Sequence, residues 1–174
     1  MRIFLIGYMG VGKTTIGKRL ANALDMDFLD LDHFIESSTG RSIPDIFKKE
    51  GEVAFRGLEK KYLTDICMDA DNVVVATGGG TPCFYNHMEI MNKHGITVYL
   101  QMDVRSIVYR LVHAKETRPL VEDKAPENLD EYVKQHLEER REFYEEAHIT
   151  AHALGFNQKK MEELVAEISA YSSK

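Results

Sequence analysis

The chain has 174 residues, of which 44% are hydrophobic, a net charge of −6 and two cysteines that form no spaced motif. Its length fits a single domain, residues 1–174, that is large enough to bury a substantial core. The acidic net charge argues against nucleic acid or an anionic membrane as a partner. No apolar run approaches the roughly 18 residues of a membrane span. The two isolated cysteines favour free thiols over a disulfide framework.

A phosphate-binding loop is the first motif in the chain. An apolar run at residues 3–6 leads into the segment Gly7-Tyr8-Met9-Gly10-Val11-Gly12-Lys13-Thr14, which fits G-x-x-x-x-G-K-[ST]. The glycines let the backbone curl until several N–H groups, and the positive end of the next helix, point at one anion. Lys13 supplies a charge for the β- and γ-phosphates, and the Thr14 hydroxyl can bind Mg²⁺. The motif therefore predicts a nucleotide site.

Strands and helices are predicted to alternate along the rest of the chain. We expect strands at residues 2–6, 27–32, 73–76, 97–100 and 149–151. We expect helices at about 12–24, 33–38, 52–68, 86–94, 103–112, 129–147 and 159–169, and a further short helix after an N-cap at Ser42. This alternation is typical of a parallel sheet with helices on both faces, in which ligands bind beyond the carboxyl ends of the strands.

Two aspartates are expected at the phosphate-binding edge of the sheet. If residues 27–32 form a strand, Asp30 and Asp32 point to the same side. One carboxylate can then hold the water shell of a metal ion, and the other can orient or deprotonate an acceptor hydroxyl. A role for Asp32 as a helix N-cap is equally open. The strand at 73–76 ends at Thr77, without the acidic residue of a common Walker B motif, so Asp30 is the candidate metal carboxylate.

Two arginines are candidates for binding an anion. Arg140 falls on the inward face of its helix, three residues after Leu137 and four before Tyr144. Arg56 borders the apolar stripe of another helix. An inward arginine meets either a structural carboxylate or an anionic ligand, and both interpretations stay open for each residue. Two arginines that converge would suit a small carboxylate, which guanidinium binds bidentately.

Two loops near the phosphate-binding edge of the sheet can each be interpreted either as part of a functional site or as an ordinary turn or loop. Three glycines at 78–80 end a buried strand, either as a tight turn or because a ligand approaches bare backbone there. The segment 113–126 is polar, holds two prolines and carries Arg118. It suits a mobile lid that excludes water and brings a cation onto a transferring phosphate, although a plain exposed loop has the same composition.

Taken together, these residues resemble the shikimate kinases. The shared motifs follow the family's order along nearly the whole chain: Gly7 to Thr15, residues 28–32, residues 39–43, Phe55-Arg56, Thr77-Gly78-Gly79-Gly80, Arg118-Pro119-Leu120, and Glu139-Arg140 through Tyr144. The resemblance implies a three-layer α/β/α P-loop kinase fold with a five-stranded parallel sheet of order 2-3-1-4-5 and a mobile lid. It also implies phosphorylation of the 3-hydroxyl of shikimate by ATP, a step toward chorismate and the aromatic amino acids. We expect a monomer in the cytoplasm.

The resemblance also implies a role for each matching residue. Asp32 would hold and deprotonate the reacting hydroxyl, with Lys13 and the lid residue Arg118 stabilising the transferring phosphate. Thr14 would bind Mg²⁺ directly and Asp30 through water. The substrate would be bound by Asp32, Arg56, Gly78, Gly79, Gly80 and Arg140, within a substrate-binding helical region at about 33–62. ATP would be bound by Gly10, Val11, Gly12, Lys13, Thr14, Thr15, Arg110 and Arg118, with Arg110 against adenine.

Three other functions were weighed against this one. A related small-molecule kinase, such as a gluconate kinase, would also use two arginines for a carboxylate, but it lacks the combined aspartate, glycine and Arg-Pro-Leu set. A GTP-binding switch protein would need an Asn-Lys-x-Asp motif to read guanine, and the chain has none. A protein that binds nucleotide without catalysis is disfavoured because Lys13, Asp32 and Arg118 are all present.

Overall fold

The computed structural model describes residues 1–113 and 128–173. Its centre is a parallel sheet of five strands in the order β2-β3-β1-β4-β5, which confirms the predicted order. The strands are β1 (Arg2–Ile6), β2 (Asp27–Asp30), β3 (Val73–Ala76), β4 (Ile96–Gln101) and β5 (Ile149–His152). The helices are α1 (Lys13–Leu24), α2 (Leu31–Thr39), α3 (Ile43–Asp69), the 3-10 turn η1 (Thr81–Cys83), α4 (His87–His94), α5 (Val104–Val112), α6 (Leu129–Glu145) and α7 (Gln158–Ser172).

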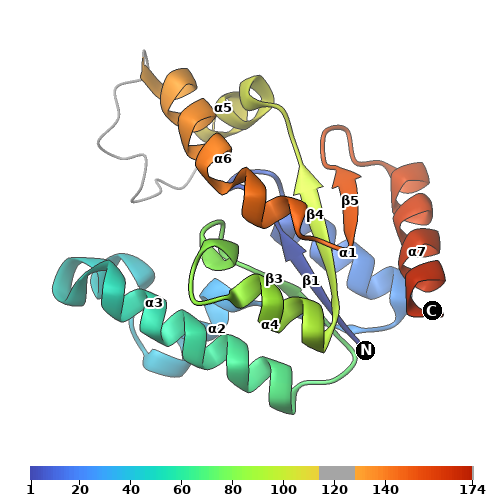
Figure 1. The fold of residues 1–174 in the computed structure, drawn as a ribbon, viewed down its shortest axis with the longest axis horizontal. Coiled ribbons are helices and arrows are strands. Elements are labelled where there is room, and N and C mark those ends of the chain that lie inside the picture. Colours follow the sequence, from blue (N-terminus) through green and yellow to red (C-terminus); the bar gives the residue numbers. More distant parts are fainter. Residues whose placement is uncertain (114–127, 174) are drawn as a thin grey trace.

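The helices form a layer on each face of the sheet. Figure 1 shows α1 and α7 on one side and α2, α3 and α4 on the other, with α5 and α6 together at the carboxyl end of β4. The central strand is buried on both faces, because its successive side chains point in opposite directions. Ile3 and Leu5 pack into the core beneath α1 and α7, whereas Phe4 and Ile6 pack into the core beneath α3 and α4.

The strand predicted at residues 27–32 is wrong at its end. The strand stops at Asp30, and α2 begins at Leu31. The Asp30 side chain causes this early change, because its carboxylate accepts a hydrogen bond from the His33 backbone N–H at 3.4 Å and so caps the helix. Asp30 is therefore the N-cap, and Asp32 lies in the first turn of the helix rather than on the strand.

The helix that follows has two parts. The Ser42 side chain accepts a hydrogen bond from the Asp45 backbone N–H at 3.2 Å, which confirms the predicted cap. Gly51 has a φ of 80° and interrupts the helical backbone inside α3. The short and the long helix predicted here are thus both present, joined at this glycine. Over the described part of the chain, none of the helices has both the length and the apolar character that a membrane span requires.

Candidate active site

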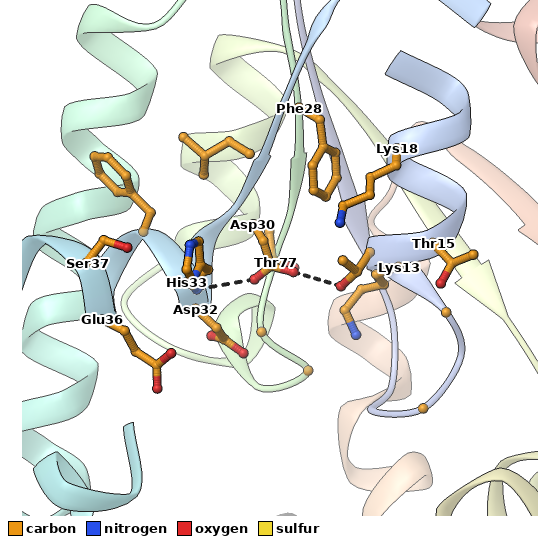
Figure 2. Close-up of a pocket in the computed structure, with 17 residues that line it drawn as sticks. Lys13, Thr15, Lys18, Phe28, Asp30, Asp32, His33, Glu36, Ser37 and Thr77 are labelled. Atoms are coloured by element: carbon orange, nitrogen blue, oxygen red, sulfur yellow. Dashed lines mark hydrogen bonds between the residues drawn. The ribbon is translucent and has the colours of Figure 1, made fainter. Parts of the chain in front are cut away.

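A cavity of about 930 Å³ opens at the carboxyl end of the sheet, between α1 and α2. Figure 2 shows Lys13, Asp30 and Asp32 round this cavity. Of the predicted nucleotide contacts, those that line it are Gly10, Gly12, Lys13, Thr14 and Thr15. The side chain of Val11 packs instead in the hydrophobic core. The cavity thus lies where the phosphate-binding motif predicts a nucleotide site.

The backbone of the loop is curled as the motif requires. Gly12, which precedes α1, has a φ of 99°, a conformation that a residue with a Cβ rarely adopts. The Lys13 ammonium is buried and donates hydrogen bonds to the carbonyl oxygens of Gly7 at 2.8 Å and Tyr8 at 2.9 Å. These two carbonyls hold the lysine inside the loop, beside the amide groups that would surround a phosphate.

The predicted magnesium ligands are adjacent. The Thr14 hydroxyl donates a hydrogen bond to the Asp30 carboxylate at 2.7 Å, and Asp32 lines the same cavity. A hydroxyl and one or two carboxylates are hard oxygen ligands, which fit Mg²⁺ held in part by nucleotide phosphates and water. Residues 1–113 and 128–173 contain no group of three or more His, Cys, Asp or Glu that could hold a metal by itself. The oxygens of Thr14 and Asp30 thus fit a metal that is also bound by phosphate oxygens and water.

A second, smaller cavity of about 110 Å³ adjoins the first. Its walls include Phe47, Phe55, Arg56 and the three glycines predicted at the site, Gly78, Gly79 and Gly80. Asp32, Gly78 and Gly79 line both cavities. A molecule in the second cavity would therefore meet the phosphate site at Asp32.

Arg56 lies deep in the wall of the second cavity, with 5% of its surface exposed. Its Nη1 donates to Glu59 at 2.8 Å and its Nη2 to Glu52 at 3.1 Å, while the Phe84 ring lies 4.2 Å from the guanidinium. A Cβ on Gly80 would lie 2.6 Å from Nη2. A side chain at this position would displace the Arg56 guanidinium, so the absence of a Cβ on Gly80 lets the arginine itself approach the bare backbone.

Glu59 is a part of this site that the sequence analysis missed. It is fully buried, and besides its ion pair with Arg56 it accepts a hydrogen bond from the Thr81 hydroxyl at 2.5 Å. A buried carboxylate needs such partners to remain charged. The signal available in the sequence was its position three residues after Arg56 on the same helix, a spacing at which side chains meet.

Arg140 points inward, as predicted, with 8% of its surface exposed. Its Nη1 is buried and has no hydrogen-bond partner within the described residues. Both Arg140 and Arg56 lie close enough to Cys83 to oppose the effect of burial, which raises the pKa of that thiol to about 11. Both arginines thus lie in the neighbourhood of Cys83, although only Arg56 lines the second cavity. The neighbouring Arg141 is exposed and pairs with Glu138 at 2.5 Å.

Arg110 contacts the phosphate-binding loop from α5. Arg110 at the end of α5 donates from Nη1 to the carbonyl oxygens of Val11 at 3.0 Å and Gly10 at 3.3 Å. It is thus packed across the phosphate-binding loop. Arg118, and the predicted lid at 113–126 apart from its first residue, lie outside the described residues.

A buried histidine, His87, and a half-buried one, His136, make the stability of the fold depend on pH. Burial lowers the pKa of His87, and burial followed by the charge of Arg140 lowers the pKa of His136 to about 4. Both rings stay neutral in the folded state below pH 6.5, where the unfolded chain takes up protons. Their contribution to stability is therefore present above pH 6.5 and is lost as the pH falls through the lowered pKa of each ring, which for His136 is about 4.

We expect the thermal unfolding midpoint to drop between pH 7 and pH 5, a range above the titration of most carboxylates. The His136→Asn variant should show a shallower drop, because one of the histidines that titrate only when unfolded is gone. Calorimetry of both proteins across that range measures the difference. Equal slopes would contradict the assignment of a neutral, half-buried His136.

Comparisons with known proteins agree on one family. A family model described as shikimate kinase matches residues 9–171. A shikimate kinase of Azobacteroides pseudotrichonymphae is 49% identical over 148 residues, which cover 85% of this chain and 87% of that protein. The crystal structure of a shikimate kinase from Bacteroides thetaiotaomicron is 39% identical with a TM-score of 0.88, covering 100% of this chain and 99% of that one.

A further solved structure adds a ligand to the comparison. The shikimate kinase of Acinetobacter baumannii, in complex with shikimate, is 38% identical with a TM-score of 0.82, covering 99% of this chain and 94% of that one. A gluconokinase from Sinorhizobium meliloti is only 16% identical, with a TM-score of 0.58, so it shares the fold alone. The gluconate kinase alternative thus has no support beyond the fold.

Proposed function

Because the chain belongs to the shikimate kinase family, we propose that its larger cavity binds ATP and its smaller cavity binds shikimate, with Asp32 between them. The chain is a kinase that phosphorylates shikimate with ATP. We propose the roles of its individual residues. The observation that carries them is that Asp32 and the first two glycines of Gly78–Gly80 line both cavities.

The acceptor half of the site would orient shikimate through its carboxylate. Arg56 on α3 and Arg140 on α6 both lie near Cys83, and the buried Nη1 of Arg140 is a donor with no partner among the described residues. Guanidinium groups bind a carboxylate in a bidentate manner. With the carboxylate held at this end, and the ring against Gly78, Gly79 and Gly80, the 3-hydroxyl would face Asp32.

The transfer step would then join the two halves. The hydroxyl oxygen forms a bond to the γ-phosphorus, the bond from that phosphorus to the β-phosphate oxygen breaks, and the hydroxyl proton moves to the Asp32 carboxylate. Lys13, which donates hydrogen bonds to the Gly7 and Tyr8 carbonyls, would stabilise charge on the transferring group. We also assign this role to Arg118 of the proposed lid at 113–126.

The nucleotide half would require Mg²⁺. We propose that the Thr14 hydroxyl binds the metal directly and that Asp30 holds one of its water ligands, since these two groups are 2.7 Å apart. Mg²⁺ held by these residues would neutralise the charge that develops on the phosphate oxygens. The loop residues Gly10 to Thr15 would hold the phosphates, and Arg110 would pack against adenine from its place beside the loop.

The oligomeric state and the cellular location of the protein are also proposals. Both cavities are built from a single chain, so we propose that the active protein is a monomer. Cys67 and Cys83 are both free, which suits a reducing compartment, and we therefore propose the cytoplasm. The substrate-binding helical region would span about residues 33–62, which includes α2 and most of α3.

The direct test is an ADP-release assay with shikimate, gluconate and quinate in parallel, each with and without Mg²⁺. We expect turnover with shikimate alone, and only when Mg²⁺ is present. Quinate tests recognition of the ring, because it carries the carboxylate without the ring double bond of shikimate. Faster release with gluconate than with shikimate would overturn the proposal, and turnover undiminished by EDTA would overturn the metal assignment.

A further inference from the structure

One contact joins the phosphate-binding loop to α6. The Tyr8 hydroxyl is hydrogen-bonded to His136 Nδ1 at 2.9 Å, and the two rings meet edge to face with centroids 5.5 Å apart. Tyr8 is buried, and His136 is steadied on its other side by Tyr132, at 5.1 Å between ring centroids. His136 lies four residues before Arg140, so the two side chains share one face of the helix.

The ring of Tyr8 also supports Arg140. The guanidinium carbon lies 5.8 Å from the centroid of that ring, within the range of a cation–π contact. Such a contact uses the face of the guanidinium and leaves the buried Nη1, which has no hydrogen-bond partner among the described residues, available to a ligand. By contrast, the N–H groups of Arg56 are occupied by Glu52 and Glu59.

The support is also uncharged. Burial and the nearby charge of Arg140 keep the pKa of His136 low, against the opposing effect of Glu139 and Glu52, and burial raises the pKa of Tyr8. Both groups therefore stay neutral at physiological pH. A carboxylate in their place would hold the arginine equally well, but it would neutralise the charge that attracts a substrate carboxylate.

We propose that Tyr8 and His136 are positioning residues, which hold Arg140 at a set place relative to the phosphate-binding loop so that it binds the carboxylate of shikimate. The inference rests on the proposed function of Arg140. It adds that this chain uses a neutral hydrogen-bonded pair to aim the arginine. Because Tyr8 belongs to the loop, the pair also sets the distance between the carboxylate site and the transferring phosphate.

The test compares His136→Leu, which removes the polar atom, with His136→Asn, which keeps one near the position of Nδ1. We expect His136→Leu to raise the KM for shikimate about 5- to 10-fold, as the loss of one buried hydrogen bond implies. The kcat and the KM for ATP should stay within about twofold, and His136→Asn should restore most of the loss. Gln135→Leu, an exposed change on the same helix, is the matched control and should alter nothing.

Two further measurements separate positioning from general damage. Tyr8→Phe keeps the ring beneath Arg140, so the double variant Tyr8→Phe/His136→Leu should be no worse than the poorer single variant, as expected for one shared interaction. By calorimetry, the binding of shikimate should weaken in His136→Leu, while the weaker binding of shikimate methyl ester, which lacks the negative charge, should not change.

These results can overturn the inference without touching the proposed function. If the wild-type protein turns over shikimate and neither His136→Leu nor Tyr8→Phe raises its KM, the positioning role is wrong. Equal losses of kcat and of both KM values, or equal damage in His136→Asn and His136→Leu, would also overturn it. If the wild-type protein does not phosphorylate shikimate, the proposed function itself fails. Should His136→Leu not fold, Tyr8→Phe alone still decides.

Discussion

Replacing Asp32 with asparagine is expected to lower kcat by about 10²- to 10⁴-fold, the range typical for loss of a general base. Asparagine has nearly the same shape and can still accept a hydrogen bond from the 3-hydroxyl, but it cannot take its proton. The carboxylate lies where both cavities meet, so the change falls on the step that joins them. A coupled ADP-release assay at saturating ATP and shikimate measures the effect.

Asp27→Asn is the control for this variant, because Asp27 is exposed at the opposite end of β2. It should leave kcat unchanged. Nucleotide binding and the unfolding midpoint of Asp32→Asn should match the wild-type values, which separates loss of chemistry from loss of fold. A kcat within about threefold of wild type would refute the assignment of Asp32 as base.

The location of Asp32 was predictable from the sequence, but its local structure was not. Strand alternation predicted that Asp30 and Asp32 share the phosphate-binding edge, and both do line its cavity. The local reason was wrong, because Asp30 caps α2 and Asp32 occupies its first turn. A side chain that competes for a backbone N–H changes the local structure within one residue. The order of the strands and helices is not altered by such a change. The directions of the Asp30 and Asp32 side chains, however, cannot be predicted from the two-residue alternation of a strand.

The order of the sheet was predictable for a different reason. Strands such as β3, Val73–Ala76, are apolar throughout, and short apolar runs between helical patterns leave few alternatives to a doubly covered parallel sheet. The motif at Gly7–Thr14 was equally legible, because phosphate binding needs those residue types at fixed spacing. Local signals of this kind are contained in a few consecutive residues.

Contacts between distant segments were not predictable. Tyr8 and His136 are 128 positions apart, and no periodicity in either segment indicates the other. Glu52 and Glu59 lie within one helix of Arg56, but which of the two is buried depends on η1, from which the Thr81 hydroxyl reaches Glu59. The sequence left open whether Arg56 meets a structural carboxylate or a ligand. The structure shows that Arg56 pairs with two carboxylates. Because Arg56 also lies in the cavity wall, we still propose that it contacts a ligand.

Arg140→Ala is expected to raise the KM for shikimate about 10- to 100-fold, while the KM for ATP changes less than about twofold. Charge-assisted hydrogen bonds contribute roughly 1.5–3 kcal/mol each, which corresponds to this range. Arg140 carries a buried Nη1 with no partner among the described residues, and we propose the substrate carboxylate as the partner that this change would remove. Steady-state kinetics with each substrate varied in turn measures the two constants.

Arg141→Ala is the matched control, because the neighbouring arginine is exposed and pairs with Glu138 on the helix surface. An exposed ion pair of this kind contributes little, so neither KM should change. Arg140→Lys should resemble Arg140→Ala more than wild type, since lysine keeps the charge but loses the planar fork that binds a carboxylate through two parallel hydrogen bonds. A KM for shikimate that is unchanged in Arg140→Ala would mean that the inward face of α6 serves packing alone, and that the carboxylate is bound elsewhere.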